Sequence, residues 1–166
     1  SPTESEEYNQ NFILDKVEFS LIYSKIGVRK ISLECHPEKS AIQTSSPVNN
    51  QSQKIYKYLK EYFQGEKSCF NRFDPIYIDT DFQKEVLFWT SLIPVSRTTY
   101  YGKIGKWMNN NCSQAIGQAL KKNPLPIIIP CHRVIGKNGD LTGFASGLKI
   151  KRKLLEIEDS HTSPNK

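Results

Sequence analysis

The sequence predicts an α+β fold in which a strand-rich N-terminal part precedes a mostly helical C-terminal part. Residues 12–33 alternate between apolar and polar side chains, which is the period of a β-strand. From residue 80 onward, apolar side chains recur at helical spacing. The 166 residues suffice for one ordinary domain or two small ones. The predicted parts are a disordered tail at residues 1–10, an N-terminal α/β domain at 11–79, a C-terminal domain at 80–158 and a disordered tail at 159–166.

The alternation at the start of the chain predicts a β-hairpin. Its strands are expected at residues 17–23 and 28–33, with a turn near Gly27. A stretch rich in Ser, Asn and Gln at residues 40–53 is typical of a loop.

One helix and a further strand are expected to complete the N-terminal part. Ile55 and Leu59, with Tyr62 or Phe63, share one face of a helix that Gly65 ends. Residues 76–78 have the composition of a third strand.

The C-terminal part begins with a helix whose start is signalled by a capping box. Thr80 is followed by Gln83, the spacing at which the two side chains can bond to each other's backbone N–H groups. Pro94 is expected to end this helix. The apolar stripe of the helix consists of Phe82, Val86, Trp89 and Ile93.

Two short helices separated by a turn then predict a helix-turn-helix. They are expected at residues 101–108 and 113–122, with an Asn-rich turn at 109–111, and a last helix follows at 148–158. In the second helix, Ile116 and Leu120 face inward. The outward face, which carries no bulky apolar group, consists of Gln114, Gly117, Gln118 and Lys121.

Gly117 admits two interpretations. A glycine costs about 1 kcal/mol relative to alanine inside a helix, so a close approach of another backbone, such as a DNA strand, would explain its presence. The alternative is a glycine tolerated on a solvated face.

The segment around Cys131 is the strongest candidate for chemistry. Residues 127–129 are three isoleucines that predict a short buried strand, which Pro130 ends. Cys131 is a candidate nucleophile, and the adjacent His132 is a candidate base that needs a turn or a bridging water to reach the thiol. Glu158 ends an otherwise apolar helix face and could orient the imidazole. The alternatives are a cysteine buried as a small apolar side chain and a solvated carboxylate.

Composition excludes several other classes. No apolar run is long enough to cross a membrane, and the N-terminus does not resemble a signal peptide. None of the four cysteines forms a C-x-x-C pair, which argues against a zinc ribbon or a redox dithiol, and disulfides remain open on parity alone. The net charge of +6 permits binding to a polyanion.

Together these residues resemble the O6-alkylguanine-DNA alkyltransferase family, the methylated-DNA–protein-cysteine methyltransferases. Residues 129–134, Ile-Pro-Cys-His-Arg-Val, match its core motif. The resemblance extends from about residue 55 to 158 and is weaker before that. Flanking matches are Tyr62-Phe63-x-Gly65, Phe82-Gln83, Ile93-Pro94, Tyr101-Gly102-x-Ile104, Asn123-Pro124-Leu125-Pro126, Gly143-Phe144, Gly147-Leu148 and Leu154-Leu155-x-x-Glu158.

The resemblance implies a ribonuclease-H-like antiparallel sheet with a helix in the N-terminal domain and a helix-turn-helix that enters the DNA minor groove. It also implies DNA repair by direct reversal, in which a damaged guanine is flipped out of the duplex and its alkyl group passes irreversibly to Cys131. Each molecule then acts once, without a cofactor or a metal ion. The implied partner is double-stranded DNA containing O6-alkylguanine, bound by a monomer inside the cell, in the nucleus of a eukaryote or otherwise in the cytoplasm.

The family roles carry over to matching positions. Cys131 resembles the alkyl acceptor, His132 its water-mediated base and Glu158 the group that polarises the base. Asn123 would brace the hinge after the recognition helix, and Tyr101 would donate its hydroxyl to the leaving guanine. Tyr100 remains a rival for this last role, because the following turn is one residue short of the family pattern.

Further residues would surround the substrate. The carbonyls of Cys131 and Val134 would accept the guanine amine, and the N–H of Ala145 would face O6. The implied substrate-binding set is Val134, Pro126, Phe144, Ala145 and Ser146. The implied DNA-binding set is Gln114, Ala115, Gly117, Gln118, Lys121 and Arg133, although Arg133 is expected to brace the fold more than to touch substrate.

Two features depart from the family pattern. Gln114 replaces the usual arginine that fills the gap left by the flipped base, so we expect weaker stabilisation of the flipped state. Cys35-His36 does not make up the zinc site of some members, since two ligands are too few. The alternatives to the repair function are a non-catalytic sensor of alkylation damage with the same fold and a thiol hydrolase.

Overall fold

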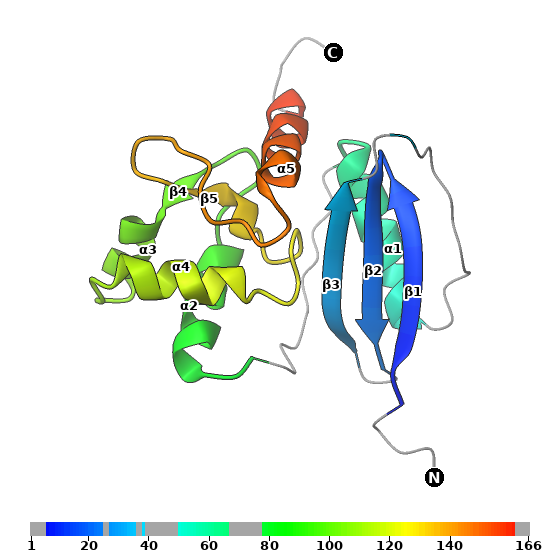
Figure 1. Ribbon diagram of the computed structural model, residues 1–166, viewed down its shortest axis with the longest axis horizontal. Coiled ribbons are helices and arrows are strands. Elements are labelled where there is room, and N and C mark those ends of the chain that lie inside the picture. The colour runs from blue at the N-terminus through cyan, green and yellow to red at the C-terminus, as the bar shows by residue number, and fades with distance from the viewer. Residues whose placement is uncertain (1–5, 25–26, 36–37, 39–49, 67–77, 162–166) are drawn as a thin grey trace. The chain divides into compact units, whose positions relative to one another are not determined.

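The computed structural model forms two compact units that divide after Tyr77. The residues that the structure describes are 6–24, 27–35, 38, 50–66 and 78–161. The first unit contains a β-sheet with one helix, and the second is mostly helical (Figure 1). This confirms the α+β class.

The first unit is built on a three-stranded antiparallel sheet in the order β1-β2-β3 (Figure 1). The strands are β1 (Tyr8–Leu14), β2 (Val17–Tyr23) and β3 (Val28–Cys35). Every second residue of β2 is buried, as the sequence alternation predicted. The predicted hairpin of residues 17–33 is confirmed by the pairing of β2 with β3.

Strand β1 corrects the prediction of a disordered tail up to residue 10. Tyr8 pairs with Tyr23, and their rings stack with centroids 5.7 Å apart. The first residues of this strand are mostly polar, so the sequence pattern did not predict it. Its pairing with β2 depends on a tight turn at Asp15 and Lys16, both at positive φ.

Helix α1 (Asn50–Phe63) packs against the sheet through aromatic contacts. The ring of Phe12 meets Tyr56 edge-on at 4.9 Å, and Phe19 meets Phe63 at 5.6 Å. The helix begins at Asn50, so the predicted loop to residue 53 was too long. Most of the strand predicted at 76–78 lies outside the described residues, and Ile78 is not in a strand.

In the second unit, the described residues 78–161 form four α-helices, which make up most of it (Figure 1). They are α2 (Asp81–Ser91), α3 (Tyr101–Trp107), α4 (Ser113–Lys121) and α5 (Leu148–Ser160). The predicted helices are confirmed, and α5 continues into the segment that was predicted to be a disordered tail from residue 159. None of the helices seen in the described ranges combines the length and apolar character that a membrane crossing requires.

Half of the predicted capping box is formed at α2. The Thr80 hydroxyl accepts the Gln83 N–H at 3.1 Å, but the Gln83 side chain donates instead to the carbonyls of Ala119 and Lys122. These bonds tie α2 to α4 and turn Gln83 into the core. The buried face is therefore shifted from the predicted stripe, and consists of Gln83, Val86, Leu87 and Thr90.

The predicted helix-turn-helix is formed by α3 and α4, which pack together. The turn approaches α3 so closely that a Cβ on Gly105 would clash with the carbonyl oxygen of Asn110. Asn109 adopts a positive φ of 52°, which asparagine tolerates better than most residues. Glycine at 105 is therefore required for this turn.

The three isoleucines do not form the predicted strand. Residues 126–129 make a turn closed by a single bridge between Pro126 and Ile129, and Ile127 has a positive φ of 73°. A β-branched residue rarely adopts this conformation. Among the described residues, two named strands pair in parallel elsewhere, β4 (Thr99–Tyr100) and β5 (Val134–Ile135).

Candidate active site

Cys131 lies in a short 3-10 turn (Cys131–Arg133) and is 7% exposed. The turn is held by bonds from the N–H of Cys131 to the Ile129 carbonyl at 2.8 Å and from Arg133 to Pro130 at 3.0 Å. The N–H of Val134 donates to the Cys131 carbonyl. The sequence predicted that His132 could act as a base for the thiol either through a turn or through a bridging water, and a turn is present here.

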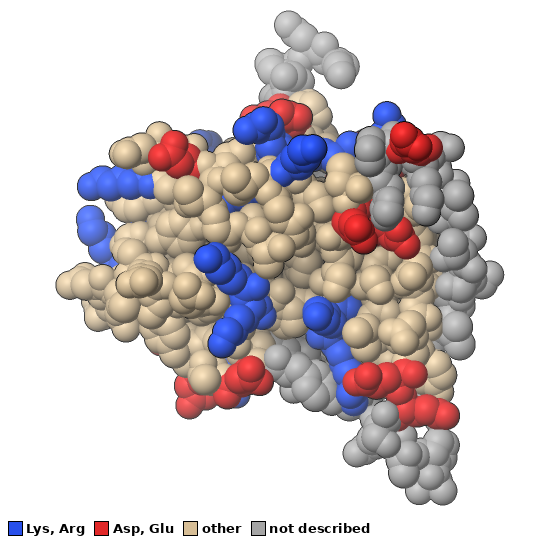
Figure 2. Space-filling view, in the orientation of Figure 1, with Lys and Arg blue, Asp and Glu red and all other residues tan. Residues whose placement is uncertain are grey.

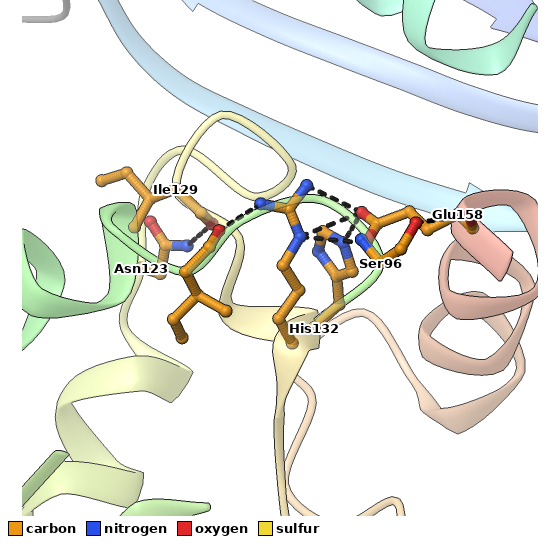
Figure 3. Close-up of polar contacts among 7 residues, drawn as sticks. Ser96, Asn123, Ile129, His132 and Glu158 are labelled. Atoms are coloured by element: carbon orange, nitrogen blue, oxygen red, sulfur yellow. Dashed lines mark hydrogen bonds and ion pairs between the residues drawn. The ribbon is translucent and has the colours of Figure 1, made fainter. Parts of the chain in front are cut away.

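Asn123 braces the segment that leads to the cysteine (Figure 3). Its Nδ2 donates to the Ile129 carbonyl at 2.9 Å, and its Oδ1 accepts the Leu125 N–H at 3.0 Å. The N–H of Ile129 donates to the Leu125 carbonyl at 2.8 Å. These bonds satisfy the backbone that a strand ladder would otherwise satisfy.

His132 and Glu158 meet in the interior (Figure 3). Nε2 of His132 lies 2.6 Å from Oε1 of Glu158, and the two side chains are 0% and 1% exposed. Arg133 donates from Nε and Nη2 to the same carboxylate and from Nη1 to the Ile93 carbonyl. Ser96 donates from its backbone to Oε2 of Glu158 at 3.1 Å.

This cluster bears on the interpretations of Glu158 and Arg133 made from the sequence. Glu158 is not a solvated helix end, because it is buried between two cationic or polar partners. Arg133 is 5% exposed and braces the fold. Its guanidinium binds the Glu158 carboxylate and the Ile93 carbonyl inside the protein, and its assignment to the DNA-binding set stays a prediction.

The charges of the cluster follow from the balance between its burial and its hydrogen bonds. Burial alone would raise the pKa of Glu158, but the hydrogen bonds from His132 and Arg133 lower it well below its ordinary value. Burial lowers the pKa of His132, and the charge of Arg133 adds to this, while Glu158 opposes it. The arrangement favours an ionised Glu158 beside a neutral imidazole, which is the form that can accept a proton.

The thiol itself is not ionised at rest. Burial raises the pKa of Cys131 to about 11, while the Asn123 side chain and the charge of Lys151 act in the opposite direction. An attacking thiolate therefore has to be formed by proton removal. Because Glu158 engages Nε2 of His132, a relay from the thiol has to use Nδ1.

Lys151 is a residue that the sequence analysis missed. It lies in a run rich in basic residues, 149–153, yet its side chain is 1% exposed. Its Nζ donates to the Val134 carbonyl at 2.6 Å and to the Thr142 carbonyl at 2.9 Å. The signal that could have found it is its spacing, since Lys151 shares the helix face of Leu154 and Glu158 at i, i+3 and i+7.

Tyr101 faces the same loop. Its hydroxyl donates to the Thr142 carbonyl at 2.8 Å, and a Cβ on Gly143 would lie 3.0 Å from that hydroxyl. Burial raises the pKa of Tyr101, and the charge of Cys131 contributes in the same direction. The Thr142 carbonyl that accepts the Tyr101 hydroxyl also accepts Lys151, whereas the Tyr100 ring lies against Gly102.

Helix α4 presents the predicted outward face. Gln114, Gln118 and Lys121 are exposed, Gly117 is half-buried, and Ile116 and Leu120 are buried beneath them. A Cβ on Gly117 would make only ordinary contact with the Tyr101 ring, at 3.8 Å. In the view of Figure 2, the basic side chains of this unit lie as separate groups and form no continuous band.

The predicted substrate-binding residues are divided between two segments. Pro126 and Val134 are buried on either side of the cysteine turn. Phe144, Ala145 and Ser146 lie in a turn before α5, where the Gly147 N–H bonds to the Phe144 carbonyl at 3.1 Å. The carbonyls of Cys131 and Val134 already accept one bond each, and a carbonyl oxygen has a second lone pair to offer.

Within the described ranges, no three His, Cys, Asp or Glu residues gather to hold a metal ion. Cys35 is exposed, and His36 lies outside those ranges.

Comparison with known proteins places this geometry in context. A family model described as "6-O-methylguanine DNA methyltransferase, DNA binding domain" matches residues 81–160. The chain is 34% identical to a methylated-DNA–protein-cysteine methyltransferase of Shigella flexneri, over 76% of this chain and 73% of that protein. It is 49% identical to a protein of the same name from Methanosarcina acetivorans, over 61% of this chain. This match spans 65% of the archaeal protein, just under two thirds of its length.

Solved structures show a similar fold. The crystal structure of Mycobacterium tuberculosis O6-methylguanine methyltransferase superimposes with a TM-score of 0.78 at 29% identity, covering 96% of this chain and 97% of that one. A structure of the mycobacterial OGT in complex with DNA gives a TM-score of 0.75 at 31% identity, covering 92% and 94%.

Proposed function

Because this chain belongs to the methylated-DNA–protein-cysteine methyltransferase family, we propose that it repairs DNA by transferring an alkyl group from O6-alkylguanine to Cys131. The transfer is irreversible, so each molecule acts once. The observation that carries the proposal is the placement of Cys131 beside a buried His132–Glu158 pair. A cysteine that served only as core packing would not need this pair.

The proposed step is a displacement at the alkyl carbon. The thiol proton passes to His132 through a water molecule, and the thiolate forms a bond to the alkyl carbon while the bond between that carbon and O6 breaks. The electron pair of the broken bond leaves with the guanine, and a proton from the Tyr101 hydroxyl neutralises its developing charge. Proton return from His132 to Tyr101 through solvent completes the balance, so the net product is a thioether and a restored guanine.

Tyr101 has to change its partner for this step. Its hydroxyl donates to the Thr142 carbonyl in the free protein. We propose that the flipped guanine takes over this donor when it enters the site, with the carbonyls of Cys131 and Val134 accepting its amine. Pro126, Phe144, Ala145 and Ser146 would line the rest of the pocket.

Helix α4 would contact double-stranded DNA. Its exposed face lacks bulky apolar groups, and Ala115, Gly117, Gln118 and Lys121 would lie along the groove. Flipping a base costs a few kcal/mol, roughly. Gln114 can occupy the gap and hydrogen-bond to the orphaned base, but it lacks the charge of an arginine.

Intact mass spectrometry tests the proposal. After mixing with a duplex that contains O6-methylguanine, the protein should gain one methyl group in place of a hydrogen, and the Cys131 peptide should carry it. Cys131→Ser should abolish the gain, while Cys112→Ser, at an exposed cysteine, should not. Tight binding to the lesion without any mass change would instead support a non-catalytic damage sensor. Many product molecules per protein would support a hydrolase.

The proposed substrate also leads to expectations about the oligomeric state and the cellular compartment of the protein. We expect one monomer to act on each lesion, in the compartment that holds the DNA, which is the nucleus in a eukaryote and otherwise the cytoplasm. Sedimentation of the protein alone would show a single species at the monomer mass.

A further inference from the structure

Lys151 is a fully buried lysine that the proposed transfer does not yet use. Its side chain is 1% exposed and belongs to the largest fully buried side chains of the described part of the chain. Lysine is almost never buried to this degree unless its charge is compensated, because the ammonium loses its hydration. The buried ammonium of Lys151 therefore needs compensating partners inside the protein.

The two hydrogen bonds of Lys151 join segments that the site depends on. Val134, whose carbonyl it binds at 2.6 Å, is the residue that ends the Cys131 turn. Thr142, whose carbonyl it binds at 2.9 Å, also accepts the Tyr101 hydroxyl at 2.8 Å. One ammonium thus ties the turn of the nucleophile to the loop that holds Tyr101.

The charge of Lys151, held at the residue that ends the Cys131 turn, acts on the thiol. Lys151 lowers the pKa of Cys131, and the thiolate in turn raises the pKa of Lys151. The other basic groups near the thiol are engaged elsewhere: His132 and Arg133 both bind the Glu158 carboxylate. Burial lowers the pKa of Lys151 to about 8, so the ammonium still predominates at neutral pH.

We propose that Lys151 is a positioning residue for alkyl acceptance, which stabilises the Cys131 thiolate with its buried charge and holds the Cys131 turn against the Thr142 loop. The inference rests on the proposed transfer to Cys131. It adds a second electrostatic component: His132 removes the thiol proton, and Lys151 balances the negative charge that remains. Lys151 also lowers the pKa of His132, which keeps the imidazole in its proton-accepting form.

The pH profile of Cys131 reactivity distinguishes an effect of the Lys151 charge from a purely structural role of its side chain. In Lys151→Gln the thiol should lose its neighbouring cation, so its pKa should rise and the profile of Cys131 reactivity should move to higher pH. We expect modification of Cys131 by iodoacetamide, followed by the mass of its peptide, to be about tenfold slower at neutral pH, the change that one pKa unit causes. Methyl transfer from a duplex with O6-methylguanine should slow in parallel.

The matched control is Lys149→Gln, the same change at an exposed lysine of the same helix. It should leave the pH profile where it is in the unaltered protein. If Lys151→Gln reacts more slowly at every pH with an unchanged inflection, Lys151 only supports the structure and the inference is overturned. Wild-type rates and profile in Lys151→Gln would overturn it as well.

Two further measurements keep the outcomes distinct. If Lys151→Gln fails to fold, Lys151→Arg retains the charge: an inflection pH equal to that of the unaltered protein supports the inference, and a rise overturns it. Failure of the unaltered protein to accept a methyl group would refute the proposed function. Methyl transfer by the unaltered protein, together with an unshifted Lys151→Gln profile, would refute the role of Lys151 alone.

Discussion

Nε2 of His132 lies 2.6 Å from Oε1 of Glu158, and this contact joins the turn of the nucleophile to the last turns of α5 across 26 residues of sequence. Arg133 binds the same carboxylate on both oxygens. Because the guanidinium compensates the carboxylate, the imidazole does not have to be charged to satisfy it. The contact with Glu158 orients the imidazole ring of His132, and the compensation by Arg133 leaves the ring able to accept a proton.

Glu158→Gln should therefore destabilise the protein and slow the transfer together. Removing one partner of a buried pair leaves the charge of Arg133 uncompensated, a loss of about 3–5 kcal/mol at neutral pH. Urea unfolding measures the free energy, and single-turnover methyl transfer measures the rate. Glu156→Gln, at an exposed position of the same helix, should change neither.

The pH dependence of this stability has a defined sign. The pKa of Glu158 is lowered in the folded protein, so its contribution is complete above its unfolded pKa of about 4.3 and is lost as the pH falls toward its folded pKa. The lowered pKa of His132 acts in the same direction, beginning below about 6.5, because the unfolded chain binds that proton first. The stability difference between the unaltered protein and Glu158→Gln should shrink on acidification, and a constant difference would contradict the assignment.

Local periodicity was enough to predict much of the second unit. The outward face of α4 and the helix that carries Glu158 follow from spacing within one helix, where side chains three and four residues apart share a face. The family motif then assigned roles to Cys131, His132 and Asn123, and the structure brings all three together.

Other parts of the site could not be predicted because they depend on contacts between distant segments. The three isoleucines have the composition of a strand, but the Asn123 side chain satisfies their backbone and permits the turn at Ile127. The β4–β5 pair joins residues 35 positions apart. Lys151 was hidden in a basic stretch, since burial of a lysine depends on carbonyls that only the folded chain supplies.

Tyr101→Phe should slow methyl transfer by about 100-fold, the lower end of what a positioned proton donor contributes. The ring remains to fill its place beside Gly117, but the hydroxyl that would reach the guanine is lost. Single-turnover rates at saturating DNA measure the effect. Tyr100→Phe is the control and should transfer at the normal rate, because its ring lies against Gly102. The reverse pattern would assign the donor role to Tyr100.

Gly117→Ala should separate folding from DNA binding. The added methyl group makes only ordinary contact with the Tyr101 ring at 3.8 Å, and alanine favours a helix over glycine by about 1 kcal/mol. The variant should therefore unfold at a higher urea concentration. If a DNA strand approaches α4 closely at this point, the same methyl group should weaken duplex binding, as measured by fluorescence anisotropy.

Gln118→Ala is the control for Gly117→Ala, since it shortens a side chain on the same face without adding bulk. Its affinity for the duplex should be closer to that of the unaltered protein than the affinity of Gly117→Ala is. Unchanged DNA binding in Gly117→Ala would show that this glycine is merely tolerated on a solvated face.

Gln114→Arg should strengthen the engagement of damaged DNA. Gln114 is exposed at the start of α4, at the position where the family resemblance leads us to expect an arginine. An arginine is longer and charged, and a hydrogen bond to a charged donor contributes more than a neutral one, so the transfer rate at subsaturating DNA should rise about tenfold.

Any added cation on this face would also attract phosphates, so the comparison variant is Gln118→Arg, which adds the same charge one helical turn away. Gln118→Arg should raise binding to methylated and unmethylated duplexes equally, whereas Gln114→Arg should favour the duplex whose base is flipped. The ratio of the two affinities, measured at one fixed salt concentration, isolates the gap-filling role. Equal ratios in the two variants would mean that position 114 contributes charge alone and does not stabilise the extruded base.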